Sequence, residues 1–417
     1  MKQKVHVVYI ITKLELGGAQ KVCLSLLKGL KQSNHTSLLI SGNEGPLVKE
    51  AQKYTNVILI DSFLREISIK TIFKELRTFF RLVKELRTLK KQYPELIVHT
   101  HSTKAGLLGR WAAFFAGVKK RVHTIHGHAF NNFQPNPIWF AIYFLELITS
   151  LITTHFICVS QKDAAIGTKL FPRFAKKHSI IHAAVEWDAF YQPTRHIKER
   201  FISRAILPAK KVSDPIPFIF GTVACFKKQK NLFDLLNAFN EVHKKQGHPQ
   251  TSFEQAPLQQ APLEQTSFEQ TSPIFTKLEL IGDGVLRPQI ESWIQEHNLE
   301  NAITLHGWQS SIAPIIKQWN AFVLTSLWEG LPCAVVEARL LGIPVISYKT
   351  GGIPEIIYHN QNGLLYEQKD VAGIIEGMRT LIENPKLYRR MCTFNDTLET
   401  FKNKVMVENH VSLYKNL

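Results

Sequence analysis

The sequence is poor in cysteine and in acidic residues. Its five cysteines are scattered and form no Cys-x-x-Cys pair, which argues for a reducing compartment and against a structural zinc site. Only 34 acidic residues stand against 51 lysines and arginines, so the formal net charge is +17. Such a balance favours anionic partners, among them phosphorylated substrates, membrane surfaces and nucleic acid, without choosing between them.

The chain also lacks the pattern of an export signal and of a plain membrane span. The first residues, MKQKVHVVYIITK, have a short apolar run and no following cleavage site, so we expect a first strand there. The most apolar stretch, 138–157, approaches transmembrane length but is interrupted by Glu146 and by threonines. We expect this stretch to be buried or apposed to a membrane. The protein is expected to be cytoplasmic, either free or peripheral on the inner face of the cytoplasmic membrane.

Short apolar runs of strand length alternate with helical patterns twice along the chain. This alternation predicts an α/β fold with doubly wound parallel sheets, and 417 residues are too many for one core. Few regular signals and four prolines mark residues 187–217, where we place the domain boundary. We expect a first domain over 1–190, a linker over 191–216, a second domain over 217–397 and a closing helix within 398–417.

One segment of the expected second domain breaks the alternation. Residues 247–273 repeat TSFEQ at Thr251 and Thr266, and APL at Ala256 and Ala261. The segment is rich in Gln, Pro, Ser and Thr and has no sustained period. We therefore expect a disordered, repeat-expanded surface loop that carries no chemistry.

The stretch 325–357 predicts a strand end, a turn, a helix, a second strand and a Gly-rich loop. Pro332 suits the first position of a helix, which would run over 333–341. Glu329 lies in the turn and Glu337 about a turn and a half into the helix. The free N–H groups of a helix start attract a diphosphate, and carboxylates accept hydrogen bonds from sugar hydroxyls. The spacing fits a nucleotide sugar, and equally an ordinary helix with Glu337 facing solvent.

Several short motifs in this stretch coincide. S-x-x-E-G-L-P at 326–332 is followed by G-I-P-V-I-S at 342–347, T-G-G-I-P-E at 350–355 and N-G-L-L at 362–365. Together they resemble the donor-site segment of the family 4 retaining glycosyltransferases. The resemblance implies the GT-B fold, in which two Rossmann-like doubly wound parallel-sheet domains face a central cleft and the final helix crosses back onto the first domain.

The resemblance assigns donor-binding roles within the same stretch. Glu329 would bind the hydroxyls of the donor sugar and position its anomeric carbon. Gly330 and Leu331, with the helix behind them, would hold the sugar and the diphosphate. Glu337 would bind the ribose hydroxyls.

Two further segments match the family pattern in part. Gly17 and Gly18 join the first strand to the first helix; a plain tight turn would explain them, but the family carries a similar double glycine facing the donor. Lys230 matches a lysine that neutralises the leaving phosphates, whereas Cys225 stands where the family has an arginine. Lys227 or Lys228 could replace that charge, or could simply belong to a solvated turn.

Five histidines end two neighbouring predicted strands: His99, His101, His123, His126 and His128. A metal site is one interpretation, but the surroundings are poor in carboxylates and cysteines, and GT-B enzymes generally work without a bound metal. T-I-H-G at 124–127 resembles a family motif whose histidine faces the reacting sugar, so His126 is our second catalytic candidate beside Glu329. Gly282, in a Gly-Asp-Gly turn, is a candidate contact on the nucleotide side.

Residues 65–93 predict a long helix with one apolar face and many lysines and arginines elsewhere. The apolar positions include Phe73, Leu76 and Phe80 and continue to Val83 and Leu86. The pattern fits a core helix with a solvated basic face, and it also fits a helix docked on an anionic membrane. The sequence leaves both interpretations open.

Together with the resemblance, these residues imply a retaining glycosyltransferase that needs no metal or other cofactor. The donor would be a nucleotide diphosphate sugar, with UDP as the favoured nucleotide, and the group moved would be a hexosyl or N-acetylhexosaminyl group. The acceptor would be a glycan or a polyprenyl-diphosphate-linked glycan of cell-surface polysaccharide or lipopolysaccharide biosynthesis.

Two alternatives stay open. Cys225 in place of arginine favours a binding protein of the GT-B fold that has lost catalysis. The net charge would also suit a membrane or nucleic-acid binder, whose affinity should fall steeply with salt. Nucleic acid is not an expected partner, because the sequence carries no motif for it.

Overall fold

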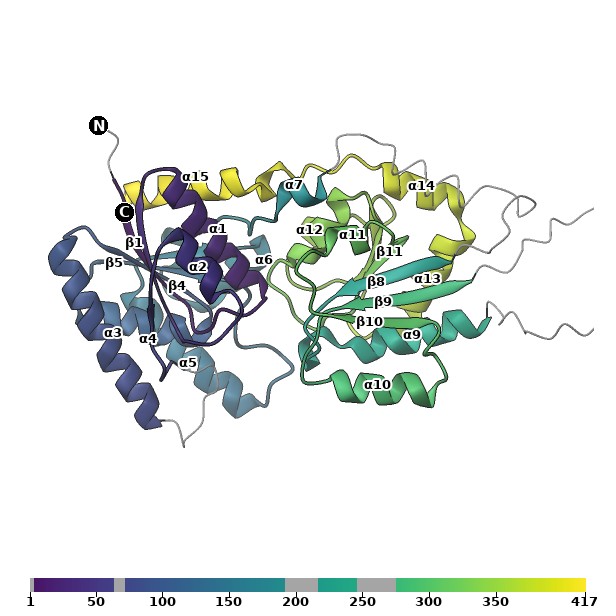
Figure 1. Cartoon of the computed structure of the whole chain (residues 1–417), viewed down its shortest axis with the longest axis horizontal. Coiled ribbons are helices and arrows are strands. Elements are labelled where there is room, and N and C mark those ends of the chain that lie inside the picture. The colour runs from purple at the N-terminus through teal and green to yellow at the C-terminus, as the bar shows by residue number, and fades with distance from the viewer. Residues whose placement is uncertain (1–3, 64–71, 192–216, 246–274) are drawn as a thin grey trace, which may run out of the picture.

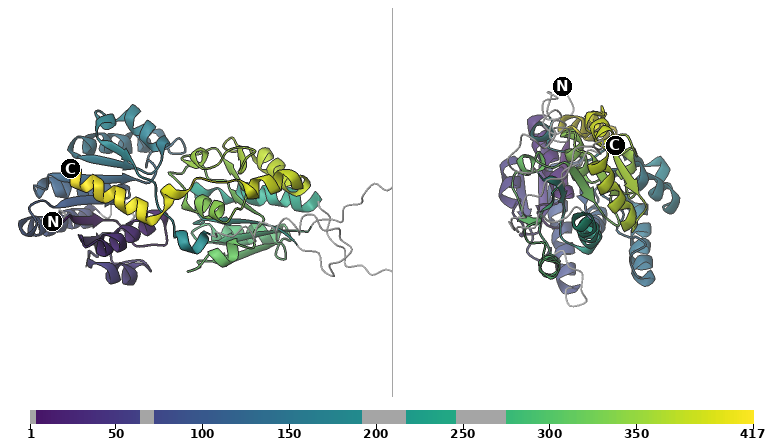
Figure 2. Two further views of the ribbon diagram at one scale, coloured as in Figure 1. Left: turned by 90° about the horizontal axis from the view of Figure 1, so that it is seen from above. Right: turned by 90° about the vertical axis from the view of Figure 1, so that its right-hand side faces the viewer.

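The computed structural model describes residues 4–63, 72–191, 217–245 and 275–417. Nearly all of the expected linker and the whole repeat segment, 247–273, lie outside the described residues. The described elements build two lobes that lie side by side along the long axis of the molecule (Figures 1 and 2). We call them the first lobe and the second lobe in chain order.

The first lobe is built on a seven-stranded sheet with the order β3-β2-β1-β4-β5-β6-β7. Every neighbouring pair in it is parallel. The strands are β1 (His6–Ile10), β2 (Thr36–Ser41), β3 (Asn56–Leu59), β4 (Ile97–His101), β5 (Lys120–Ile125), β6 (His155–Cys158) and β7 (His178–Ile180).

Helices cover both faces of this sheet. Alternate residues of β1 show this directly, because Val7 and Tyr9 pack into the core beneath α1 whereas Val8 and Ile10 pack into the core beneath α3 and α4. The α-helices of this lobe are α1 (Gly18–Gln32), α2 (Val48–Tyr54), α3 (Ile72–Gln92), α4 (Thr103–Phe115), α5 (Asn136–Ile152) and α6 (Gln161–Leu170). The short helix α7 (Trp187–Phe190) packs against α12 (Cys333–Leu340) of the second lobe.

The second lobe is built on a six-stranded parallel sheet with the order β10-β9-β8-β11-β12-β13. Its strands are β8 (Phe218–Val223), β9 (Thr276–Ile281), β10 (Ile303–Gly307), β11 (Ala321–Leu324), β12 (Val345–Tyr348) and β13 (Gly363–Tyr366). Its α-helices are α9 (Leu232–Lys245), α10 (Arg287–Glu296), α11 (Ala313–Ile316), α12 (Cys333–Leu340), α13 (Val371–Glu383) and α14 (Pro385–Thr393).

The last helix, α15 (Asn403–Asn416), lies on the first lobe, although the chain reaches it from the second (yellow in Figures 1 and 2). It packs against α1, and the hydroxyl groups of Tyr9 and Tyr414 lie 2.9 Å apart in the buried interface. The two parallel Rossmann-like sheets confirm the predicted fold class. The sequence analysis missed the short strands β7 and β13 and the helices α2, α6, α7, α11, α13 and α14.

The apolar face predicted for residues 65–93 is divided in the structure. Val83 and Leu86 are buried in the core, as a core helix requires. Phe73, Leu76 and Phe80 are 81%, 49% and 65% exposed. The interpretation as a core helix therefore fits the carboxyl-terminal half of α3, whereas the apolar positions of its amino-terminal half are exposed.

Within the described ranges, no helix is both long enough and apolar enough to cross a membrane.

Candidate functional site

The start of α12 is where most of the predicted site residues gather. The buried strand β11 ends at Leu324, and the loop that follows leads into α12 at Cys333. Pro332 is the N-cap of α12, with a φ of −76°, and not its first helical residue as predicted. The loop therefore delivers Glu329 and Gly330 just ahead of the free backbone N–H groups of the helix.

Glu329 forms an ion pair with Lys230. The Lys230 Nζ and Glu329 Oε1 atoms are 2.5 Å apart, and the two side chains are only 15% and 8% exposed. Two candidates separated by about a hundred residues in sequence thus meet in one shielded place. The cation of this pair can meet the negative charge of a diphosphate, and the carboxylate can accept a hydrogen bond from a sugar hydroxyl.

Backbone contacts explain why Lys230 lies beside Glu329. Lys230 ends a short 3-10 turn, η4 (Lys228–Lys230), which follows β8. Within that turn, the side chain of Gln229 donates to the Trp328 carbonyl (2.6 Å), and the backbone carbonyl of Gln229 accepts from the Leu327 N–H (2.8 Å). These bonds fasten the η4 turn to the loop that carries Glu329.

Glu337 is buried, with 5% of its surface exposed. This finding contradicts the alternative of an ordinary helix with Glu337 facing solvent. Burial raises the pKa of the Glu337 carboxyl to about 7; the positive charge of Lys21 opposes the rise, and the negative charge of Glu186 adds to it. The carboxyl therefore titrates near neutrality.

Lys21 is a residue that the sequence analysis missed. It lies in the first turn of α1 in the first lobe, and its charge acts on Glu337 and on Cys333 in the second lobe. The start of α1, where Gly17 is the N-cap and Gly18 the first helical residue, thus faces the start of α12. A basic side chain one turn after a double glycine was a signal that could have been used.

His126 follows β5 in the first lobe, and its ring is held by another histidine. His101 Nδ1 and His126 Nε2 are 2.9 Å apart. Burial lowers the pKa of His126 to about 4, and the nearby His410 contributes to the shift. The imidazole is therefore neutral at pH 7, able to exchange hydrogen bonds but carrying no charge.

The other histidines of the predicted cluster have structural partners. His99 lies 2.5 Å from the Tyr414 hydroxyl of α15 and 2.6 Å from that of Thr124. His123 bonds Thr100 (2.9 Å), and His128 bonds the carbonyl of Asp163 (3.0 Å). Within the described part of the chain, no group of three or more His, Cys, Asp or Glu side chains is arranged to hold a metal ion.

The two lobes touch at Gly330 and His126. A Cβ atom at Gly330 would lie 2.6 Å from the His126 carbonyl oxygen and 2.7 Å from the Gly127 nitrogen. Only a glycine allows backbones to approach so closely. The contact brings the two catalytic candidates, Glu329 and His126, to opposite sides of one narrow junction.

Other contacts across this junction were not predicted. The rings of Phe133 and Trp328 stack with centroids 5.6 Å apart. Glu355 accepts hydrogen bonds from the N–H groups of Gln161 (3.0 Å) and Lys162 (3.1 Å) at the start of α6. Burial raises the pKa of the neighbouring Asp163 to about 7, and the charge of Glu355 adds to the rise. These partners are far apart in sequence, so spacing could not pair them.

The remaining candidate residues are Leu331, Gly282 and Cys225. Leu331 is buried in the core that the two lobes share. Gly282 directly follows β9, and its N–H donates to the Gly307 carbonyl (2.9 Å). Cys225 is half-buried in the loop between β8 and η4, and Lys228 is exposed.

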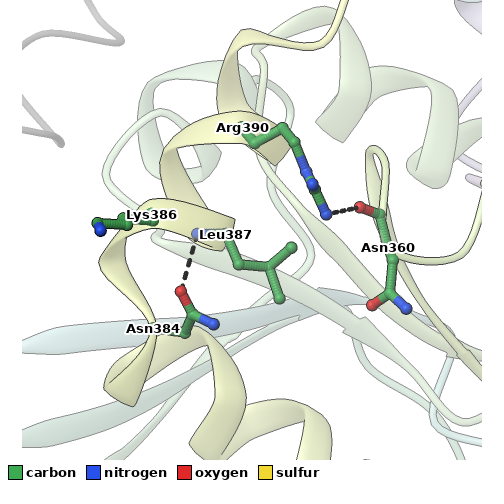
Figure 3. A pocket seen from close by; sticks show the side chains of 5 residues that line it. All are labelled: Asn360, Asn384, Lys386, Leu387 and Arg390. Carbon is green, nitrogen blue, oxygen red and sulfur yellow. Dashed lines mark hydrogen bonds between the residues drawn. The ribbon is translucent and has the colours of Figure 1, made fainter.

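A hollow of about 630 Å³ lies elsewhere on the second lobe (Figure 3). It is lined by Asn360, Asn384, Lys386, Leu387 and Arg390. Arg390 donates to the Asn360 carbonyl (2.8 Å), and Asn384 caps the start of α14. None of the predicted site residues lines it.

Comparison with known proteins follows the division into lobes. The model of the family "Glycosyltransferase Family 4" matches residues 16–212, and the model "Glycosyl transferases group 1" matches residues 267–394. The second match contains Glu329 and Glu337, and the first contains His126 and the double glycine.

Two curated relatives from Escherichia coli are enzymes of glycan assembly. The chain is 28% identical, over 90% of its length and 87% of the relative, to a UDP-Gal:alpha-D-GlcNAc-diphosphoundecaprenol alpha-1,3-galactosyltransferase. It is 35% identical to a lipopolysaccharide 1,6-galactosyltransferase of strain K12, over 41% of each chain.

A solved structure shares the whole fold. HepE of Anabaena, crystallised in complex with UDP and glucose, superposes with a TM-score of 0.74 over 99% of both chains, at 16% sequence identity. This likeness confirms the GT-B arrangement of the two lobes.

Proposed function

Because this chain belongs to the family 4, group 1 glycosyltransferases, we propose that it transfers a hexosyl or N-acetylhexosaminyl group from a UDP-sugar to a lipid-linked glycan with retention of configuration. The observation that carries the proposal is the convergence of Lys230, Glu329 and Glu337 at the start of α12. A helix start, a lysine and two shielded carboxylates match the phosphates, the sugar and the ribose of such a donor.

Glu329 binds the hydroxyls of the donor sugar and sets the position of the anomeric carbon. Its short ion pair with Lys230 holds both side chains in place before the donor arrives. The diphosphate then shares the charge of Lys230 and the N–H groups at the start of α12, which stabilise the negative charge that develops on the leaving UDP. Glu337 accepts hydrogen bonds from the ribose hydroxyls.

His126 completes the site from the first lobe. Its neutral ring, oriented by His101, and its backbone carbonyl face the sugar across the junction with Gly330. Carbonyl and imidazole dipoles stabilise positive charge on an oxocarbenium-like sugar without adding a repelling charge. The departing phosphate oxygen takes the proton of the acceptor hydroxyl, so no protein base is assigned.

Positive charge for the leaving group comes from the protein in this scheme. Lys230 and the start of α12 supply it even though Cys225 replaces the family's arginine, and we propose that no metal is required. Transfer should therefore persist in the presence of a chelator such as EDTA, and a strict need for Mg²⁺ or Mn²⁺ would contradict this part of the proposal.

The acceptor is proposed from the relatives and from the charge of the chain. The E. coli relative that aligns over most of this chain acts on a diphosphoundecaprenol-linked sugar, and a net charge of +17 suits an anionic diphosphate at an anionic membrane. We propose a polyprenyl-diphosphate-linked glycan of cell-surface polysaccharide or lipopolysaccharide assembly, met at the cytoplasmic face of the membrane.

The test is a screen of nucleotide sugars by thermal shift, followed by UDP release with the donors that bind. We expect stabilisation by a UDP-sugar and its loss in Glu329→Ala. Donor binding without UDP release, even with lipid-linked acceptors present, would indicate a binding protein that has lost catalysis. Equal shifts in the wild type and in Glu329→Ala would contradict the proposed donor site.

A further inference from the structure

Helix α5 is inverted in polarity compared with an ordinary surface helix. Its buried side chains are the polar ones, Glu146, Thr149 and Ser150. Its outward side chains are apolar, and the largest are Ile138, Phe140, Phe144, Leu145 and Leu151, which are all at least half exposed. A helix in contact with water alone would place these two sets the other way round.

The inversion is built into the core. Glu146 is the one charged residue of α5, and it forms an ion pair with the fully buried Arg110 of α4 (2.8 Å). Trp111 of α4 donates from its indole N–H to Thr149 (2.9 Å). These buried polar contacts fix the rotation of α5. Trp139, Ile142, Tyr143 and Leu147 pack inward against a core cluster, and the remaining large apolar side chains of the helix face outward.

Two neighbouring helices extend the same surface. α4 packs between α3 and α5, and it ends in Phe114 and Phe115, which are 44% and 54% exposed. Phe115 meets Phe79 of α3 edge to face, with centroids 5.9 Å apart. We call this outer surface of α3, α4 and α5, at the lower left of Figure 1, the α3–α5 face.

A basic stripe runs beside an apolar stripe on α3. Phe73, Leu76 and Phe80 lie three and four residues apart and are exposed, and Lys74, Arg77, Arg81 and Lys84 follow the same spacing one residue later, also exposed. The acidic residues of the helix are neutralised locally, because Glu75 pairs with Lys104 and Glu85 with Arg81. Glu85 offsets the charge of Arg81, so the stripe keeps its positive charge at Lys74, Arg77 and Lys84.

We propose that the α3–α5 face docks on the surface of a bilayer that contains anionic phospholipid. Exposed aromatic and aliphatic side chains beside lysines and arginines are the pattern of a helix lying in the membrane interface. The apolar side chains enter the acyl boundary, and the basic stripe meets the lipid phosphates. The inference rests on the proposed function to the extent that a lipid-linked acceptor requires the enzyme to reach a membrane.

The position of α5 agrees with such an acceptor. The loop after His126 carries Phe133, which stacks on Trp328 at the junction of the lobes, and then enters α5 at Asn136. The amino-terminal end of the inverted helix therefore lies next to the candidate site. A diphosphate-linked sugar could enter the site there while its lipid chain stays in the bilayer.

The experiment measures co-sedimentation of the full chain with large unilamellar vesicles, either of phosphatidylcholine alone or with added phosphatidylglycerol. We expect binding to the vesicles with phosphatidylglycerol, weakened by salt. Replacing Phe140, Phe144 and Leu151 together by Ser should weaken binding by roughly a hundredfold. Replacing Lys74, Arg77 and Lys84 together by Gln should weaken it by about a hundredfold as well, at some fivefold for each charge.

Matched variants on other surfaces provide the controls. Lys386→Gln, Arg389→Gln and Lys404→Gln together remove three exposed positive charges outside the α3–α5 face, and Tyr358→Ser removes an exposed aromatic ring from the second lobe. Both variants should bind vesicles within about twofold of the wild type. All variants are checked for an unchanged thermal unfolding midpoint before vesicle binding is compared.

Three outcomes would overturn the inference: no binding to vesicles with phosphatidylglycerol, wild-type binding by both face variants, or a dimer that the apolar face variant dissociates, since a second copy would then cover the face. Transfer to a water-soluble acceptor is measured separately without vesicles, and the face variants should keep it. A chain that transfers sugar but ignores vesicles contradicts only this inference, whereas one that binds vesicles through this face but transfers no sugar contradicts only the proposed function.

Discussion

The two lobes are built on the same kind of sheet but differ in what their helices present to the outside. In the first lobe, α3, α4 and α5 expose a run of large apolar side chains beside positive charge. Among the described residues of the second lobe, the exposed large apolar side chains are only Val285, Trp308 and Tyr358. The same sheet architecture can therefore carry helices with mostly polar outer sides or helices with an apolar outer side that can bind a partner.

The difference indicates that the two lobes have different roles, donor binding in the second and membrane binding in the first. In the second lobe, Glu329, Lys230 and Glu337 lie shielded at the start of α12. The first lobe lends that site His126 and the charge of Lys21, and it keeps its unusual surface on the far side of α4. If this division holds, changes at the helix start should spoil donor binding and leave membrane binding alone.

The largest effect is expected from Glu329→Ala. Loss of the carboxylate removes the acceptor for the sugar hydroxyls and leaves Lys230 without its partner, so kcat/KM should fall by on the order of a thousandfold. Vesicle binding should not change. Steady-state kinetics with Glu376→Ala, an exposed acid on α13, as control will check this, and a fall of less than tenfold would refute the role of Glu329.

Lys230→Gln should lower kcat/KM by about a hundredfold, because the charge that meets the leaving phosphates is lost. Lys228→Gln, two residues earlier and exposed, should lower it by about twofold at most if that lysine belongs to a solvated turn. Equal losses in the two variants would show that Lys228 replaces the missing arginine charge at Cys225.

Gly330→Ala tests the contact between the lobes. The added methyl group would lie 2.6 Å from the His126 carbonyl oxygen, so the junction cannot close as it does here. We expect kcat to fall by roughly tenfold to a hundredfold while the second lobe keeps its fold. Small-angle scattering should show a more extended molecule, and an unchanged profile with full activity would exclude this contact from catalysis.

Glu337→Gln should have the smallest effect, about fivefold on donor affinity at alkaline pH, because charged hydrogen bonds to the ribose become neutral ones. The wild-type carboxyl has a pKa of about 7, so wild-type affinity should weaken as the pH falls through that value. The affinity of the variant should be flat over the same range. Titration calorimetry across the range measures both, and parallel profiles would contradict the assignment.

The same substitution has an opposite effect on stability. The folded-state pKa of Glu337 is raised from its ordinary value of 4.5 to about 7, so its contribution to stability is full below 4.5 and is lost as the pH rises through 7. Glu337→Gln should therefore unfold at a higher temperature than the wild type above pH 7. The difference should vanish in acid. Thermal unfolding at a series of pH values measures it, and a variant that is less stable than the wild type above pH 7 would contradict the raised pKa.

The sequence predicted the fold and the second-lobe site because both depend on local order. Strand and helix periods run along the chain, and Glu329 and Glu337 are only eight residues apart, in one loop and the helix that follows it. Lys230 was found through the resemblance alone, since its partner lies about a hundred residues away. Lys21, Phe133 and Glu355 were missed because their contacts depend on how the lobes meet, which no local pattern records.

The α5 surface was only half predicted, although a signal was present. Glu146, Thr149 and Ser150 lie three and four residues apart, so they share one side of an otherwise apolar helix. One polar side on such a helix indicates that this side is the one with partners. The prediction of a buried or membrane-apposed stretch used Glu146 and the threonines only as interruptions of an apolar run, and it did not use the side of the helix that they share.

The central claim is that the UDP-sugar donor binds at the start of α12, between Glu329 and Glu337. A crystal structure of the chain with an intact, non-hydrolysable UDP-sugar tests it most directly. We predict that the sugar hydroxyls lie within hydrogen-bond distance of Glu329, the ribose hydroxyls of Glu337, and the diphosphate between Lys230 and the start of α12. A donor bound elsewhere, for example in the hollow beside Arg390, would contradict the account.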